Sequence, residues 1–131
     1  MTQRLINKIA LVTGAAGGLG QAICKRLAAE GARVVVTDIH QAKAQGVAEA
    51  IGESAMAIAL DVTSENSWRD GLSAVTAKWG GLDILVNNAG YLKPATIEEA
   101  TLHDWQTVQR INGDSVFLGC KPDCQHDRRR T

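Results

Sequence analysis

The sequence predicts an α/β protein in which helices cover both faces of a parallel sheet. Short apolar runs alternate along the chain with amphipathic segments of helical period. The apolar runs, such as 33–37, are continuous, which is typical of strands covered on both faces. A glycine-rich stretch, 13–20, joins the first apolar run to the first helical pattern. Strands that alternate with helices imply right-handed crossovers and therefore a doubly wound sheet.

The elements can be assigned in order from these patterns. We expect strands at 9–12, 33–37, 56–60 and 82–86, and helices that begin after the glycine-rich stretch, at Gln41, at Thr63 or Ser64, and at Thr101. In the first helix Leu19, Ile23 and Leu27 recur every four residues and predict one apolar stripe, which Gly31 ends.

Aromatic residues mark the faces of the later helices. We interpret them as packing residues rather than as a ligand platform. The third helix is predicted to bury Trp68, Leu72, Val75 and Trp79, and the fourth, capped by Thr101 and Asp104, is predicted to turn inward Trp105, Val108 and either Ile111 or Asn112.

The glycine-rich stretch indicates a phosphate-binding loop between a strand and a helix. Gly14 allows a tight turn, Gly18 allows a pyrophosphate to approach the backbone, and Gly20 allows the helix to lie close to the sheet. Backbone N–H groups at the start of the helix then face the phosphates. A mobile turn is the alternative interpretation of the glycines alone.

Polar residues follow the other strands at their carboxyl ends, where a doubly wound sheet binds ligands. Asp38 follows the second strand, Asp61 the third, and Asn87-Asn88-Ala89-Gly90 the fourth. Their convergence with the glycine loop at one edge of the sheet predicts a dinucleotide site.

The loop pattern Thr-Gly-x-x-x-Gly-x-Gly at 13–20 and the Asn-Asn-Ala-Gly turn at 87–90 resemble the short-chain dehydrogenase/reductase family. The resemblance runs from Lys8 to about Lys121 and implies a Rossmann-type sheet, truncated after about four strands. It divides the chain into an incomplete NAD-binding domain, 1–120, and an atypical polar and basic tail, 121–131.

The resemblance implies NAD as the cofactor. The implied cofactor-binding residues are Thr13, Gly14, Gly18, Leu19, Gly20, Asp38, Asp61, Val62, Asn88, Ala89 and Gly90. Asp38 is placed to accept hydrogen bonds from both adenosine ribose hydroxyls and to repel a 2′-phosphate, which favours NAD over NADP. Asp61 is expected to accept from the adenine amine. Capping of the following turn or helix is the alternative for both carboxylates.

The same family uses a Tyr, a Lys four residues later and a Ser for hydride transfer between NAD(H) and a secondary alcohol or ketone. The only tyrosine, Tyr91, has Ala95 at the lysine position. Asn112 is the sole catalytic position that transfers, as a helix-kinking asparagine whose backbone carbonyl helps to hold a water; a solvent-facing Asn is the alternative. We therefore expect no dehydrogenase turnover from this chain alone.

The tail departs from the family pattern, because 121–127 is polar and contains Pro122. Codons for 123–127 read one base later permit an apolar pattern, so a frameshift near residue 121 is a hypothesis that sequencing of the gene decides.

A fourth strand left at the sheet edge would expose apolar surface. This predicts a marginally stable or self-associating domain.

The composition indicates an ordinary globular protein. Fourteen basic and fourteen acidic residues cancel, which gives no argument for binding nucleic acid, and no apolar run approaches a membrane span of about 20 residues. We expect a cytoplasmic protein, with Cys24 as a buried apolar residue. Cys120, Cys124 and His126 are too few for a closed zinc site, so no metal is predicted.

The leading interpretation is the NAD(H)-binding portion of a short-chain dehydrogenase/reductase. The stretch 111–120 looks like the bacterial hydroxysteroid dehydrogenase branch, with a small-molecule alcohol or ketone as the family's substrate. The alternative is a non-catalytic nucleotide-binding fragment, or a frameshifted product without activity. His40, His103 and His126 form no ligand pattern, and Arg128–Arg130 is interpreted as a solvated basic end.

Overall fold

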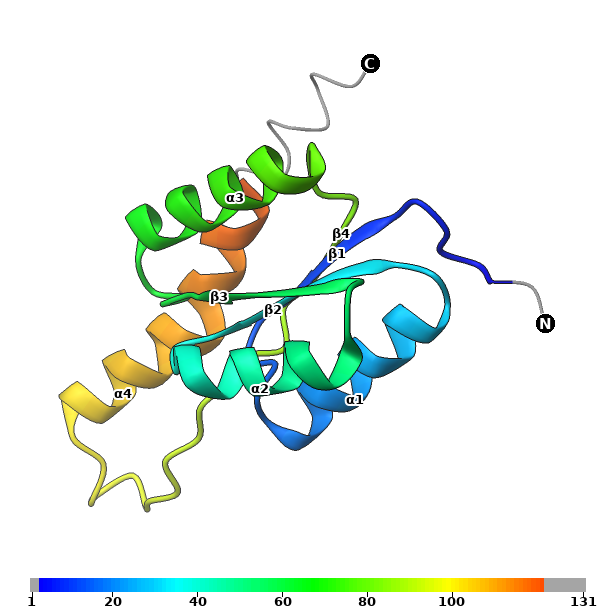
Figure 1. Ribbon diagram of the computed structural model, residues 1–131. Helices are drawn as coiled ribbons and strands as arrows, with labels where there is room; N and C mark the ends of the chain where they lie inside the picture. Colours follow the sequence, from blue (N-terminus) through cyan, green and yellow to red (C-terminus); the bar gives the residue numbers. More distant parts are fainter. Residues whose placement is uncertain (1–2, 122–131) are drawn as a thin grey trace.

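The computed structural model describes residues 3–121, in which a four-stranded parallel sheet is covered by helices on both faces (Figure 1). The strands are β1 (Ile9–Val12), β2 (Arg33–Asp38), β3 (Ala55–Ala59) and β4 (Ile84–Val86). The helices are α1 (Gly18–Ala29), α2 (Gln41–Ile51), α3 (Glu65–Trp79), α4 (Leu102–Gln109) and a π-helical segment, η1 (Arg110–Asp114). The predicted doubly wound α/β fold is confirmed.

The strands lie in the order β3-β2-β1-β4, and all three pairs are parallel. The chain therefore moves outward from β1 to β3 and then returns to the other side of β1. This reversal places the switch point of the sheet between β1 and β4, where the first loop and the turn after β4 meet. Ligands of doubly wound folds bind outside the strand ends at such a point.

Strand residues alternate between two apolar clusters, one on each face of the sheet. Val34 and Val36 pack with Cys24 and Val47 in the cluster beneath α1 and α2. On the other face Val35 and Leu11 contribute to the cluster that α3 covers, whose buried members also include Ile9, Leu60, Trp68, Leu72, Val75 and Leu82. Because both faces are covered, the strand sequence is apolar without interruption.

The helix ends follow from local chemistry. Ser64 caps α3 by accepting a hydrogen bond from the Ser67 amide, and Gly80 ends the helix in the left-handed conformation. Thr101 and Asp104 form the predicted capping box at the start of α4. Gly31 follows α1 with a φ of 96°. The predicted starts of α3 and α4 and the predicted end of α1 are confirmed.

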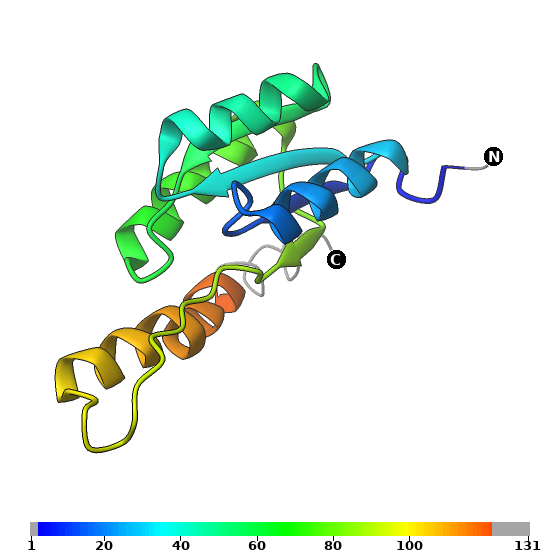
Figure 2. The ribbon, with the colours of Figure 1, turned by 90° about the horizontal axis from the view of Figure 1, so that it is seen from below.

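Two predicted helix faces are each wrong at one residue, although Ile23 and Leu27 of α1 do pack against the core as predicted. Leu19 is 70% exposed, because α1 turns Gly20 and Cys24 toward the sheet instead. Trp105 is 63% exposed, because α4 extends beyond the sheet (Figure 2), where none of its own residues is buried. Trp68, at 1% exposed, and the partly buried Trp79 do pack as predicted.

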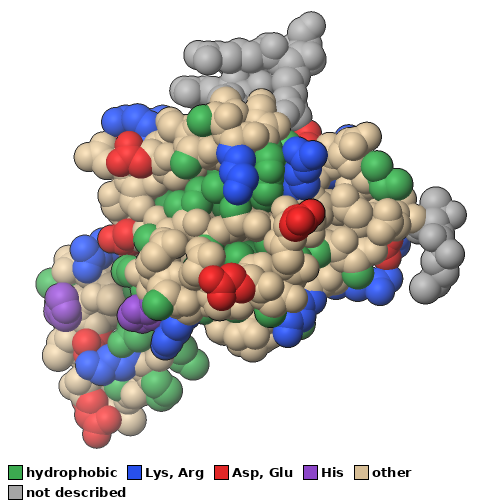
Figure 3. Space-filling model, in the orientation of Figure 1, with side chains coloured by type: hydrophobic (Ala, Val, Ile, Leu, Met, Phe, Trp, Pro, Cys, Tyr) green, Lys and Arg blue, Asp and Glu red, His purple; other side chains and the backbone are tan. Residues whose placement is uncertain are grey.

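The surface seen in Figure 3 carries Lys and Arg side chains interspersed with Asp and Glu. Within residues 3–121 no helix is long and apolar enough to span a membrane, and no group of three or more His, Cys, Asp or Glu residues could hold a metal. The predictions for Cys124, His126, Arg128–Arg130 and the tail from 122 onward lie outside the described residues.

Candidate functional site

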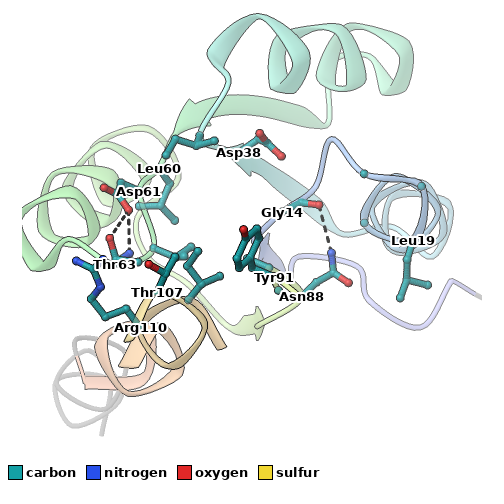
Figure 4. A pocket seen from close by; sticks show the side chains of 18 residues that line it. Gly14, Leu19, Asp38, Leu60, Asp61, Thr63, Asn88, Tyr91, Thr107 and Arg110 are labelled. Carbon is teal, nitrogen blue, oxygen red and sulfur yellow. Dashed lines mark hydrogen bonds between the residues drawn. The ribbon is translucent and has the colours of Figure 1, made fainter. Parts of the chain in front are cut away.

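A cavity of about 750 Å³ opens at the carboxyl ends of the strands (Figure 4). All predicted site residues except Thr13 and Asn112 line this cavity; they are Gly14, Gly18, Leu19, Gly20, Asp38, Asp61, Val62, Asn88, Ala89 and Gly90. The structure thus brings together residues that follow four different strands. The cavity also exposes Leu19, which explains why this side chain does not join the core.

Two glycines of the loop are required by the packing of the chain itself. Gly14 has a φ of 58°, and a Cβ there would lie 2.9 Å from the Cα of Ala89. A Cβ on Gly20 would lie 2.7 Å from the Cα of Ala15 and 2.9 Å from Nδ2 of Asn88. These positions let the loop, α1 and the turn after β4 approach one another.

Gly18 is different, because a Cβ there would meet no atom of the described chain within 4 Å. It begins α1 and lines the cavity. The N-cap, Gly17, provides no side-chain cap, and the first turn of α1 contains no acidic residue. The first-turn N–H groups and the open space at Gly18 therefore fit an anionic group of a ligand, as in a phosphate-binding loop.

Thr13 and Asn88 link the glycine-rich loop after β1 to the turn after β4. The buried Thr13 hydroxyl accepts hydrogen bonds from the amides of Asn88 (3.0 Å) and Ala89 (2.9 Å). In return Nδ2 of Asn88 donates to the carbonyls of Thr13 (3.1 Å) and Gly14 (3.2 Å). Thr13 does not line the cavity. It holds the turns after β1 and β4 together.

Asp38 stands at the end of β2 with both carboxylate oxygens in use. Oδ2 accepts from the Ala16 amide (3.3 Å), and Oδ1 accepts from the His40 amide (3.0 Å). A carboxylate has about four lone-pair sites, so each oxygen can still accept a ligand hydroxyl. The amide of Ala16 thus fixes Asp38 against the glycine loop while leaving it available to the cavity.

Asp61 and Val62 line the cavity at the end of β3. Oδ1 of Asp61 accepts from the amide (3.0 Å) and the hydroxyl (2.7 Å) of Thr63. The carbonyl of Val62 accepts from Nε1 of the buried Trp68 (2.9 Å). Ser64, not Asp61, caps α3. These contacts hold the backbone after β3 against the core.

Asn112 lies in the π-helical segment η1, which fits the helix kink that the family resemblance implies at this position. Its side chain makes two hydrogen bonds of 2.8 Å to the backbone of Tyr91, accepting from the amide and donating to the carbonyl. Asn112 is exposed, as the solvent-facing alternative expects, but its side chain is bonded to the backbone of Tyr91 rather than free in solvent. Asn112 does not line the cavity; it fixes the segment that carries Tyr91 into it.

Several residues that line the cavity were not predicted from the sequence: Gly17, Ile39, Leu60, Thr63, Tyr91, Thr107, Arg110 and Ile111. Ile39, Thr63 and Tyr91 directly follow predicted site residues, so proximity in sequence could have found them. Thr107, Arg110 and Ile111 share a helical face by their spacing of three and four. Their orientation depends on where α4 lies, which the sequence alone did not place.

Cys24 is buried on the side of α1 that faces the sheet, as predicted. Its exposed fraction is 0%, and burial raises the pKa of its thiol to about 11. Cys120 is exposed and lies 3.8 Å from Nδ2 of Asn87. The described thiols are therefore one inert core residue and one accessible residue.

The family model of the short chain dehydrogenases matches residues 8–128. The chain belongs to this family, and its sheet is a Rossmann-type sheet. It is 45% identical over 121 residues to the 3-beta-hydroxysteroid dehydrogenase of Comamonas testosteroni, a match that covers 92% of this chain and 48% of that protein. A 3-alpha-(or 20-beta)-hydroxysteroid dehydrogenase of Mycobacterium tuberculosis is 40% identical, with 92% and 46% covered.

Solved structures agree with this assignment. A short-chain dehydrogenase/reductase from Brucella melitensis superimposes with a TM-score of 0.90 at 30% identity, covering 95% of this chain and 54% of that chain. A 3-ketoacyl-(acyl-carrier-protein) reductase from the same organism, complexed with NADH, gives a TM-score of 0.86 at 35% identity, covering 90% and 49%. The chain spans about half the length of the relatives it matches.

Proposed function

We propose that this chain binds NAD(H) across the carboxyl edge of its sheet. The observation that carries the proposal is the convergence of an uncapped helix N-terminus, an open glycine and a strand-end carboxylate on one cavity. The pyrophosphate lies against Gly18 and the first turn of α1. The adenosine ribose hydroxyls donate to Asp38, and the adenine lies toward Asp61.

Asp38 makes the proposed site selective for NAD(H) over NADP(H). Its carboxylate would repel a 2′-phosphate, and both of its oxygens are already held in place by backbone amides. Hydrogen bonds to charged groups contribute about 1.5–3 kcal/mol, so loss of the ribose contact corresponds to about tenfold weaker binding or more. The NADH complex of the ketoacyl reductase relative supports the choice of cofactor.

NAD(H) supplies a hydride acceptor or donor, and the family reaction that we propose is hydride transfer with a secondary alcohol or ketone. The hydroxysteroid dehydrogenases among the relatives support a hydroxysteroid-like substrate. In this chain the side chain of Asn112 holds the segment of Tyr91 beside the cavity, and the backbone carbonyl of Asn112 is the proposed water-holding group.

The Cys24 thiol is buried and forms no disulfide, which supports a cytoplasmic setting.

The proposed site is tested by titrating NADH and NADPH into the parent chain and the Asp38→Ala variant. We expect the parent to prefer NADH by about tenfold or more, and Asp38→Ala to weaken NADH and narrow the preference. Asp70→Ala on the exposed side of α3 removes the same charge away from the cavity and is the matched control. Equal affinity of the parent for both cofactors would remove the assignment of Asp38.

A second function is nucleotide binding without catalysis. It is favoured by the cavity itself, in which Tyr91 is the single tyrosine among the lining residues and has Ala95 four residues later. Both functions require NADH to bind, so they are separated by turnover. An assay of alcohol-dependent NADH formation at saturating NAD distinguishes them. Turnover above the uncatalysed rate supports the enzyme, and binding without turnover supports the binding module.

A further inference from the structure

Arg110 is the single lysine or arginine among the residues that line the cavity. It is the first residue of η1, and its side chain is exposed. Within residues 3–121 the ion pairs join Arg4 and Arg26 to Glu30, Lys93 to Asp104, and Lys121 to Glu65. None of them involves Arg110. A cation therefore faces the cavity without an anionic partner in the described chain.

The wall around Arg110 has a mixed chemistry. Figure 4 shows the Arg110 side chain reaching toward the end of the cavity where Asp61 and Thr63 lie, away from Leu19 and the start of α1. Both hydrogen bonds from Thr63 end on Oδ1 of Asp61. The apolar side chains of Leu60, Val62 and Ile111 complete this end.

The helix geometry directs Arg110 at the cavity. Thr107, Arg110 and Ile111 line it at spacings of three and four, so they share one face of the helix. A regular helix would continue that face through Asp114. The π-helical turn inserts one residue, and Ser115, which is 2% exposed, is buried while Asp114 stays exposed. The cavity wall therefore presents a cation without an acidic residue one turn later.

We propose that Arg110 recognises the adenine base by laying its planar guanidinium against the ring, an inference that rests on the proposed binding of NAD(H). A planar cation stacks on an aromatic face, and apolar side chains suit the rest of the base. The glycine loop takes the phosphates at the opposite end of the cavity, so Arg110 acts on the base and not on the pyrophosphate.

The test uses Arg110→Met, which keeps much of the aliphatic stem and removes the planar charge, and Arg110→Lys, which keeps the charge and removes the plane. Arg69→Met is the control, since Arg69 is exposed on α3 and bonds Asn66 instead of lining the cavity. Affinities for NADH are measured directly, and those for AMP, adenosine and NMNH by competition. Thermal melts check that each variant folds as the parent does.

Both Arg110 variants are expected to weaken NADH, AMP and adenosine by about two- to fivefold each, while NMNH, which lacks adenine, is unchanged. Unchanged NADH and AMP affinity in Arg110→Met would overturn the inference and leave the proposed function standing. So would a loss confined to ligands that carry phosphate, or full retention by Arg110→Lys. Absence of NADH binding to the parent would instead refute the proposed function and, with it, this inference.

Discussion

The two walls of the cavity differ in how the chain supports them. The wall made by the glycine loop rises from β1 and β2, whose residues Val12, Val34 and Val36 have no exposed surface, and it is braced by the bonds of Thr13. The wall made by α4 and η1 has no buried residue. Figure 2 shows this helix extending away from the sheet.

The α4 wall is held instead by a few polar contacts and by the helical residues that follow it. The polar contacts are the hydrogen bonds between Asn112 and Tyr91 and the ion pair of Lys93 with Asp104 (2.9 Å). In the helical residues after η1, Ser115 is buried and Gly119 lies against Trp68. Regions with few buried apolar contacts open at low free energy. One wall is thus fixed by the core, and the other is adjustable.

The largest expected difference is in thiol reactivity, between Cys24 in the core under the glycine-loop wall and Cys120 in the helical residues that follow η1. In a Cys124→Ser background we expect iodoacetamide at pH 8 to modify Cys120 at about the rate of a free thiol. Cys24 should react at least about a thousandfold more slowly than Cys120, because its reaction requires global unfolding. Peptide mass spectrometry over time measures both rates. Equal rates would contradict the burial of Cys24 in a stable core.

A matched pair of glycine substitutions tests the braced wall. Gly20→Ala forces a Cβ against the backbone of Ala15 and should cost about 3 kcal/mol of unfolding free energy, or prevent folding. Gly18→Ala meets no neighbour, so stability should stay within about 0.5 kcal/mol of the parent. NADH binding by Gly18→Ala should weaken about tenfold, which is about 1.4 kcal/mol.

Urea denaturation and NADH titration measure the two effects of the glycine substitutions. The result against the assignment of the loop is a Gly18→Ala protein that binds NADH as tightly as the parent. A stable Gly20→Ala protein would contradict the close approach of α1 to the loop.

The smallest expected effect is a pH response of the α4 wall. The hydrogen bond from Lys93 and the contacts of Thr101 hold the pKa of Asp104 below its ordinary value. A lowered carboxyl pKa stabilises the folded segment above the ordinary aspartate pKa of about 4, and this contribution is lost as the pH falls through the folded value. The protection factors of the amides at the start of α4, which are corrected for the intrinsic pH dependence of exchange, should therefore fall in acid. Asp104→Asn should abolish that pH dependence. An unchanged pH dependence in the variant would show that Asp104 is not its source.

The sequence predicts the core-supported wall better than the other. The strand positions follow from apolar runs such as 33–37, because burial on both faces leaves no polar position. The capping box of Thr101 and Asp104 was also predictable, since it depends on residues three apart. Leu19 was misplaced because helical period alone gives a stripe, whereas the side of α1 that meets the sheet depends on the contact at Gly20.

The adjustable wall was predicted less well for a different reason. The orientation of Trp105 and Arg110 depends on the position of α4 relative to the sheet and on the extra residue of η1. Neither leaves a periodic signal in the sequence. Asn112 was correctly associated with an irregular turn, but its two bonds to the backbone of Tyr91 join residues that are far apart in sequence and became visible only in the structure.

The brace beneath the loop also limits how this domain can be recombined. The hydroxyl of Thr13 and the amide of Asn88 belong to segments more than seventy positions apart, yet each satisfies groups of the other. A chimera that takes its first strand and loop from one parent and its fourth strand and turn from another inherits half of this reciprocal set. Crossover points for such libraries therefore need to leave 9–20 and 84–90 with the same parent.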